Sequence, residues 1–342
     1  MTGGRLVQLR GFDPRMRSVL LEAAGVDSLG ETSPTGTGHE AVLAQSPDVT
    51  VTFEGMRRRF DVSGWETVTR GAWRDGDGRA VIEDLGRSGI DQLVRVVDGR
   101  VDVRVRMLPT VAERLVRRLL PMRSRVLAAQ LLLHYPIMWA GCLDGRAPLH
   151  VSVVDLDGVV VMLAGPGGVG KSTLVARAIA DGAVATCDNL AICNSLEAAG
   201  VAEPLRLSAG SLAGRRTTHA RREVAWPQRA DRLRPDVVVV VRRGTGTPGL
   251  RPVGPDRARR ALVAGTFSAG ELRRFWPLVS VLSLATECGP ALPPVDEVAG
   301  ELVNRLPCYE LQLEAAPGQR LADSLRDLAG NAGSAAGLRQ AP

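Results

Sequence analysis

The sequence predicts an α/β protein: a mixed, twisted sheet with helices, preceded by a small α+β module rich in antiparallel strands. Three patterns carry this prediction. The run LVRVVDGRVDVRVRML alternates apolar and polar residues around Asp98-Gly99, which is typical of a half-buried β-hairpin. A second hairpin turns at Asp157-Gly158 and leads directly into a glycine-rich stretch and a helix. The run PDVVVVVRR over residues 235–243 is apolar without alternation, as expected of a buried central strand.

The composition is that of a globular protein long enough for two structured units. Of 342 residues, 45% are hydrophobic and 23% are charged. The net charge of +6 is spread along the chain, and only 4% of residues are aromatic, too few for a base-stacking surface. We therefore expect no nucleic-acid partner. The five cysteines lack metal-ligand spacing, and no apolar block opens the chain, so we expect reduced thiols and a cytoplasmic location.

One segment has the length and composition of a membrane span. Residues 126–143, VLAAQLLLHYPIMWAGCL, contain no formal charge. Gln130 and His134 interrupt the run, and Pro136 is expected to end a helix near His134. The sequence therefore predicts a buried helix followed by a strand or turn, and no membrane partner.

The remaining signals divide the chain into five parts. A Gly-, Ser- and Thr-rich beginning gives way to short β-like segments, and Thr110 and Glu113 then form a capping box that opens a helix. Pro121 kinks or restarts that helix. The expected parts are a loosely structured leader (1–47), a small β-rich module (48–109), a helical connector (110–147), the main α/β unit (148–316), and a short helix with a disordered tail (317–342).

The glycine-rich stretch is a complete Walker A motif. It reads GPGGVGKS over residues 165–172, with an apolar strand (159–163) before it and a helix after it. Glycines let the backbone turn its amides inward around phosphate oxygens, and the positive end of the following helix points at the same anion. The sequence therefore predicts a nucleotide site whose residues are Gly165, Gly167, Gly168, Val169, Gly170, Lys171, Ser172 and Thr173.

Lys171 is the only lysine, because the other 42 of the 43 basic residues are arginine. A compact ammonium on a flexible stem suits the β- and γ-phosphates, whereas the planar fork of arginine does not fit the loop. We expect the hydroxyl of Ser172 to bind Mg²⁺. ATP and Mg²⁺ are therefore the expected cofactors.

An acidic residue follows this first helix. The short apolar strand 183–186 leads to Asp188, 17 residues after Lys171. A carboxylate there can hold Mg²⁺, directly or through water, or take the proton of an attacking hydroxyl. The alternative is an aspartate that only caps a turn or helix.

Residues 149–193, LHVSVVDLDGVVVMLAGPGGVGKSTLVARAIADGAVATCDNLAIC, resemble the catalytic domain of HPr kinase/phosphorylase and its kinase-like relatives. The shared features are a histidine before a β-hairpin, a hairpin that feeds the phosphate loop, a short helix, and a strand that ends in acid. A weaker likeness extends to the preceding helical segment and to strand 235–243. The amino-terminal module has no comparable match.

The resemblance implies a P-loop kinase core of the phosphoenolpyruvate-carboxykinase-like type and phosphoryl transfer to a hydroxyl, often a serine of a protein or peptide. It places His150 near the transferred phosphate, beside Lys171 and Ser172, and makes Asp188 the metal ligand or base. An ordinary buried histidine is the alternative for His150. Where the family usually has two acids, this chain has Asp188-Asn189. The glycine-rich signature for the reverse reaction is not found, so phosphorylase activity is not part of the prediction.

Two further residues are weaker candidates. Arg221 and Arg222 lie in the run AGRRTTHARREVAWPQR and are expected either to face the phosphates or acceptor, or to belong to a solvated loop. The predicted function is an ATP- and Mg²⁺-dependent kinase for a hydroxyl, a serine of a small protein or peptide. The alternatives are a small-metabolite kinase and, because of Asn189, an inactive nucleotide-binding accessory or regulatory protein. The acceptor and the oligomeric state stay open, although a homo-oligomer would agree with the rings that HPr kinases form.

Overall fold

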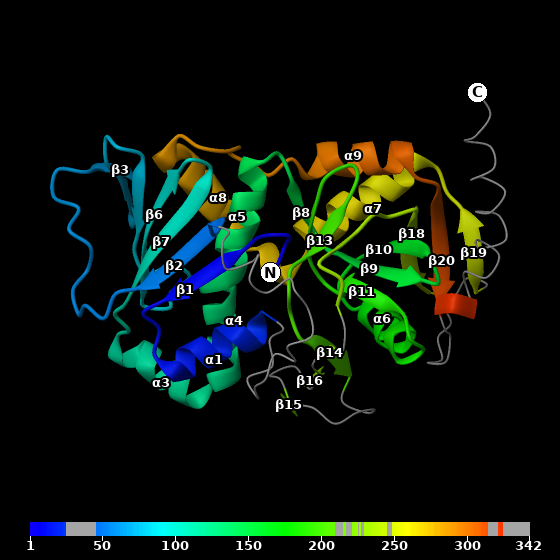
Figure 1. Cartoon of the computed structure of the whole chain (residues 1–342), viewed down its shortest axis with the longest axis horizontal. Coiled ribbons are helices and arrows are strands. Elements are labelled where there is room, and N and C mark those ends of the chain that lie inside the picture. Colours follow the sequence, from blue (N-terminus) through cyan, green and yellow to red (C-terminus); the bar gives the residue numbers. More distant parts are fainter. Residues whose placement is uncertain are drawn as a thin grey trace.

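The computed structural model describes residues 1–24, 46–208, 215–216, 221–224, 226, 229–244, 248–313 and 321–323. Two lobes, each built around a large sheet, lie side by side, and the amino-terminal lobe is on the left in Figure 1. Of the short helix expected in the tail, residues 321–323 are helical and the rest lies outside the described residues. The chain is thus a mixed α/β protein, in agreement with the predicted class.

The amino-terminal lobe contains a seven-stranded sheet. The Asp98-Gly99 turn has positive φ at both residues (50° and 72°), the geometry of a type I′ hairpin turn. The strand order is β1 (Val7–Arg10), β2 (Val49–Phe53), β7 (Arg100–Met107), β6 (Ile90–Val97), β5 (Arg79–Ile82), β4 (Ala72–Arg74) and β3 (Glu66–Thr69). The pairs β1–β2 and β2–β7 are parallel and the others antiparallel. The sheet is therefore mixed, whereas the sequence pattern predicted antiparallel strands.

The prediction of a loosely structured leader over residues 1–47 is wrong for its first half. Residues 7–10 form the edge strand β1, and α1 (Pro14–Ala23) follows it. Asp13 caps α1 by accepting hydrogen bonds from the amides of Arg15 and Met16, and Pro14 stands in the first turn where no amide is needed. Strand β1 gains backbone partners from β2, so its stability depends on a contact that local composition does not encode.

The helices that follow β7 lie between the two large sheets and below the amino-terminal sheet as drawn in Figure 1. The capping box of Thr110 and Glu113 begins the first of them, as predicted. The set comprises α3 (Val111–Leu119), α4 (Pro121–Ala129), the π-helical turn η1 (Gln130–His134) and α5 (Tyr135–Leu143).

The expected helix end near His134 is wrong, because the helix continues through Pro136 to Leu143. In the π-turn, the amide of Tyr135 donates to the carbonyl of Gln130 five residues earlier. A proline inside a helix lacks an amide and crowds the carbonyl four residues before it. The wider turn directly before Pro136 relieves that crowding.

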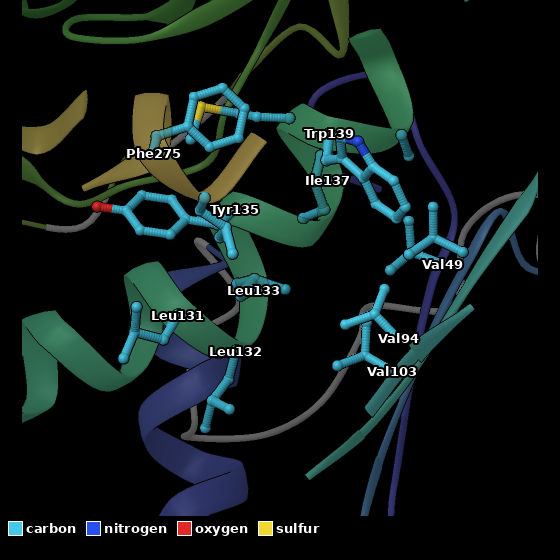
Figure 2. Close-up of a cluster of buried hydrophobic side chains, with 14 of the residues drawn as sticks. Val49, Val94, Val103, Leu131, Leu132, Leu133, Tyr135, Ile137, Trp139 and Phe275 are labelled. Atoms are coloured by element: carbon cyan, nitrogen blue, oxygen red, sulfur yellow. The ribbon is translucent and has the colours of Figure 1, made fainter. Parts of the chain in front are cut away.

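This helical stretch is the one among the described residues that is long and apolar enough to cross a membrane. Within the protein, 78% of its most apolar 18-residue window is buried. Figure 2 shows Trp139 pointing toward Val49 of the amino-terminal sheet, and all the labelled side chains belong to one buried apolar cluster. Its apolar surface thus packs inside the protein.

The carboxyl-terminal half also contributes to the amino-terminal core. Helix α8 (Phe275–Thr286) follows the short 3₁₀ turn η2 (Gly270–Leu272) and packs on strands β3 to β6. Its buried face carries Phe275, Leu278, Val279 and Leu282, as predicted. The ring centroid of Phe275 lies 5.5 Å from that of Tyr135 (Figure 2). The amino-terminal sheet is therefore covered by a helix distant in sequence.

The second lobe contains the glycine-rich loop and a six-stranded mixed sheet. Helix α6 (Lys171–Ala180) packs on one face, and α7 (Pro255–Phe267) and α9 (Val295–Arg305) pack on the other (Figure 1). The strand order is β11 (Val184–Cys187), β9 (Val151–Leu156), β10 (Val159–Ala164), β18 (Val237–Arg243), β20 (Cys308–Leu313) and β19 (Gly249–Pro252). Strand β18 is central and parallel to β10 and β20, and five consecutive valines in it are buried, as the apolar run predicted.

Two smaller sheets complete the fold. The four-stranded sheet has the order β17 (Arg232–Leu233), β13 (Ala198–Gly200), β12 (Ala191–Cys193) and β8 (Ala147–Leu149). The three-stranded sheet has the order β14 (Leu205–Ser208), β16 (Arg221–Val224) and β15 (Arg215–Arg216). The amino terminus joins the first of these, because the amide of Gly3 donates to the carbonyl of Gly200 at 2.8 Å.

Candidate functional site

The Walker A sequence forms the loop between β10 and α6. Positive φ angles at Gly165 (144°), Gly168 (81°) and Gly170 (118°) show where the chain needs glycine. Gly167 has no such angle. The tip of the loop is exposed, while Val169 is buried in the core on the α6 face of the sheet and anchors it.

The base of the loop lies tightly between β18 and α7. A Cβ atom on Gly165 would be 2.8 Å from the carbonyl oxygen of Val241. A Cβ atom on Gly265, in α7, would be 3.1 Å from the carbonyl oxygen of Gly165. Glycine at both positions allows strand, loop and helix to approach this closely. Gly265 gave no signal in the sequence, because its role depends on a segment one hundred residues earlier.

Helix α6 begins at Lys171, directly after the loop. Gly170 precedes it and has no side chain to cap the first amides, which therefore point toward the loop. The positive end of the helix dipole lies at the same place. The backbone thus offers an anion site of the kind that phosphate groups occupy.

The ammonium of Lys171 lies across the base of the loop. The side chain is buried, and Nζ donates to the carbonyl oxygens of Gly165 at 2.7 Å and Pro166 at 3.2 Å. Burial lowers its pKa to about 8, although the carboxylate of Asp188 opposes that shift. Lys171 is therefore mostly charged at neutral pH and held ready beside the loop.

Asp188 directly follows β11, at the same end of the sheet. The residue is buried, and its main-chain carbonyl accepts a 2.6 Å hydrogen bond from the hydroxyl of Ser152 in β9. Its carboxylate favours the charged form of Lys171 and so raises the pKa of that ammonium, against the effect of burial. Ser152 is occupied in this structural contact.

His150 precedes β9 and is held by α7. Its amide donates to Oγ1 of Thr266 at 3.0 Å, and Nδ1 lies 3.1 Å from the carbonyl oxygen of Gly265. Because a carbonyl only accepts, Nδ1 carries the proton in this contact. Burial first, and the charge of Lys171 second, lower the pKa of His150 to about 4. The imidazole is thus neutral at pH 7.

Asn189 connects this site to a second buried histidine. Its Nδ2 atom donates to Oε2 of Glu203 at 2.8 Å, and its side chain also hydrogen-bonds His150. Oε1 of Glu203 lies 3.4 Å from Nδ1 of His134 in the π-turn. Glu203 was not predicted from the sequence, because a lone glutamate in a loop carries no signal of burial.

The other predicted site residues differ in burial and in whether the structure describes their side chains. Ser172 is half-buried and Thr173 is exposed in the first turn of α6. Arg221 and Arg222 belong to β16, and their side chains lie outside the described part of the structure. Arg243, at the end of β18, was not predicted, and its Nη2 would lie 3.4 Å from a Cβ on Gly170. Among the described residues, no group of three or more His, Cys, Asp or Glu side chains could hold a metal ion.

Comparisons with known proteins find only a distant structural similarity. No family model and no curated protein matches the chain. Among solved structures, the Hpr(Ser) kinase/phosphatase from Coxiella burnetii is similar over 57% of this chain and 99% of its own length, with 10% sequence identity and a TM-score of 0.31. At this identity and score the resemblance is distant and concerns the fold.

Proposed function

We propose that this protein is a kinase that transfers the γ-phosphoryl group of ATP to a hydroxyl, a serine of a small protein or peptide. The observation that carries the proposal is Lys171: the only lysine is buried across a glycine-rich loop, at the start of α6 and close to Asp188. This arrangement combines fixed amides, a helix terminus and a mobile cation around one anion position. The catalytic unit of the proposal is residues 148–316.

The loop residues bind and orient the phosphates. Backbone amides after Gly168 and Gly170 would donate to phosphate oxygens, and Lys171 would exchange its loop carbonyl partners for the β- and γ-phosphates. Contact with a polyanion favours the charged ammonium and raises its pKa again. Binding would therefore recover the cost of burying this cation.

Ser172 and Asp188 fit a magnesium ion. They supply a hydroxyl and a carboxylate, the hard oxygen ligands that Mg²⁺ prefers, and Mg²⁺ commonly takes few protein ligands beside phosphates and water. When bound, Mg²⁺ neutralises phosphate charge. The second role open to Asp188 is to accept the proton of the acceptor hydroxyl.

His150 is neutral, so it contributes a hydrogen bond rather than a charge. Its ring is fixed by Gly265 and by Asn189, beside Lys171. In the proposal it orients the transferred phosphoryl group, and Arg221 and Arg222 remain weaker candidates for the acceptor side. A cytoplasmic location, where ATP is abundant and the five free cysteines stay reduced, belongs to the same proposal.

The test separates nucleotide binding from phosphoryl transfer. Binding of a fluorescent ATP analogue is titrated with Mg²⁺, and transfer is measured as ³²P incorporation from the γ-position into peptides and metabolites of a cell extract. Lys171→Ala should weaken binding at least tenfold, and Asp188→Asn should abolish labelling. Asp98→Asn is the matched control, because Asn-Gly suits the type I′ turn equally well and the turn lies in the other lobe.

Each outcome is decisive. A labelled acceptor that depends on Lys171 and Asp188 supports the kinase and identifies its substrate as a peptide, protein or metabolite. Tight ATP binding without transfer or hydrolysis would overturn the kinase in favour of the accessory protein. Equal binding by wild type and Lys171→Ala would refute the phosphate site itself.

A further inference from the structure

Glu203 is a buried carboxylate that the proposed mechanism does not use. Its side chain is 4% exposed and lies beside two polar residues, the half-buried Asn189 and the buried His134. Removing a carboxylate from water costs several kcal/mol unless good partners compensate, and apolar side chains of similar size are commonly more stabilising there. Such a group next to a candidate active site is therefore a candidate for a role in it.

The backbone fixes Glu203 from two sides. The amide of the preceding residue, Ala202, donates to Oγ1 of Thr2 at 2.7 Å, and the amide of Val201 donates to the carbonyl of Leu190 at 2.9 Å. Thr2 is itself buried. The amino terminus of the chain thus holds the segment that presents Glu203.

His134 is placed by an unusual helical turn. It is the last residue of the π-turn η1, and its side chain is almost fully buried. One-turn π-helices within α-helices occur often at functional sites, since the extra residue changes the direction of nearby side chains. This places Nδ1 of His134 3.4 Å from the carboxylate of Glu203.

The residue types at 189 and 203 are complementary. An amide at position 189 donates to the carboxylate at 203, and an acid at both positions would place two negative oxygens at hydrogen-bond distance. The same amide bonds the ring of His150, and residue 189 directly follows Asp188. The Asn189 side chain therefore links Glu203 to both proposed active-site residues.

We propose that Glu203 is a positioning residue for phosphoryl transfer: its carboxylate fixes the amide of Asn189, which in turn fixes the imidazole of His150 and the turn that carries Asp188. This proposal rests on the proposed kinase function. In this proposal, the asparagine at position 189, where HPr kinases usually have a second acid, does not impair the site. It is the partner that the carboxylate of Glu203 requires. Glu203 itself does not touch the nucleotide, so ATP affinity should be independent of it.

The experiment is a double-variant cycle with Asn189→Asp, Glu203→Gln and the two together. Asn189→Asp sets two carboxylates against each other and should lower kcat about tenfold or more, a typical coupling for groups in direct contact. Glu203→Gln alone should lower kcat a few-fold, because the bond loses its charge assistance. The double variant restores one amide and one carboxylate with their positions exchanged, and should recover most of the kcat lost in Asn189→Asp.

Three controls accompany the cycle. Binding of the fluorescent ATP analogue should stay within twofold of wild type throughout. Glu197→Gln changes another glutamate, which pairs with Arg146 and Arg232 rather than with Asn189, and should leave kcat unchanged. In nitrogen-15 spectra of the four histidines, the His150 ring, assigned through His150→Gln, should show Nδ1–H in wild type and move in Asn189→Asp.

The outcomes separate this proposal from the kinase proposal. Loss of kcat with an unchanged His150 signal, or additive losses without recovery in the double variant, would overturn the positioning role. If wild type transfers no phosphate to any acceptor, the kinase proposal fails, and Glu203 with it as a residue of transfer. The spectra then decide alone whether Glu203 orients His150.

Discussion

Replacing Gly165 with alanine should lower the stability of this protein, whereas replacing Gly167 with alanine should not. A φ of 144° at Gly165 belongs to a region that residues with a side chain avoid, at a cost of about 1–3 kcal/mol. The added Cβ would also lie 2.8 Å from the carbonyl oxygen of Val241, and overpacking of this kind costs about 1–3 kcal/mol more. We therefore expect Gly165→Ala to lower the free energy of unfolding by about 2–5 kcal/mol.

Gly167 is the matched control within the same loop. Its φ is not positive, and a Cβ there would meet no heavy atom within 4 Å. Alanine restricts the unfolded chain, so Gly167→Ala should be neutral or stabilise by up to about 1 kcal/mol. The difference between the two variants removes effects common to any Gly→Ala change.

Urea unfolding followed by circular dichroism measures both values from the transition midpoints. Equal midpoints for Gly165→Ala and wild type would refute the geometry of the loop. A loss in Gly167→Ala as large as in Gly165→Ala would refute the assignment of the constraint to φ and to Val241. The result does not depend on the proposed activity.

Three other predictions concern buried groups. The pKa of Lys171 is lowered to about 8, so the folded state binds fewer protons than the unfolded state between pH 8 and the ordinary lysine pKa. As the pH rises through that range, the free energy of unfolding of wild type should increase by about 3 kcal/mol relative to that of Lys171→Met. Parallel curves of stability against pH would contradict this. The pKa of His150 is lowered to about 4, so the folded state binds fewer protons than the unfolded state between pH 4 and 6.5. As the pH falls from 6.5 to 4, the free energy of unfolding of wild type should decrease by about 3 kcal/mol relative to that of His150→Gln. Stability curves that stay parallel would show that the ring is not buried in its neutral form. Leu132→Ala should lower the free energy of unfolding by about 2–5 kcal/mol, because Leu132 is fully buried. Leu119→Ala, on the exposed face of α3, should lower it by less than about 0.5 kcal/mol. Similar losses of stability for the two variants in thermal unfolding would refute the assignment of Leu132 to the core.

Local patterns in the sequence determined elements in both lobes. The two Asp-Gly turns, the capping box of Thr110 and the glycine-rich loop each depend on hydrogen bonds and φ angles within a few residues, so the residue types alone specify them. The valine run of β18 predicted a central strand because a strand buried on both faces needs apolar residues at each position. Lys171 stood out because a single lysine remained among arginines.

Contacts between distant segments were decided by the tertiary structure. Strand β1 is stable only beside β2, α8 covers a sheet built some two hundred residues earlier, and Gly265 and Thr266 of α7 hold His150. The pairing of Asn189 with Glu203 is of the same kind, since the sequence shows an amide and a glutamate but not their contact. The sequence by itself determined the elements that satisfy their own backbone and the glycine-rich loop. Which buried polar groups meet there depends on packing between distant segments, because burial and long-range hydrogen bonds are properties of the whole folded chain.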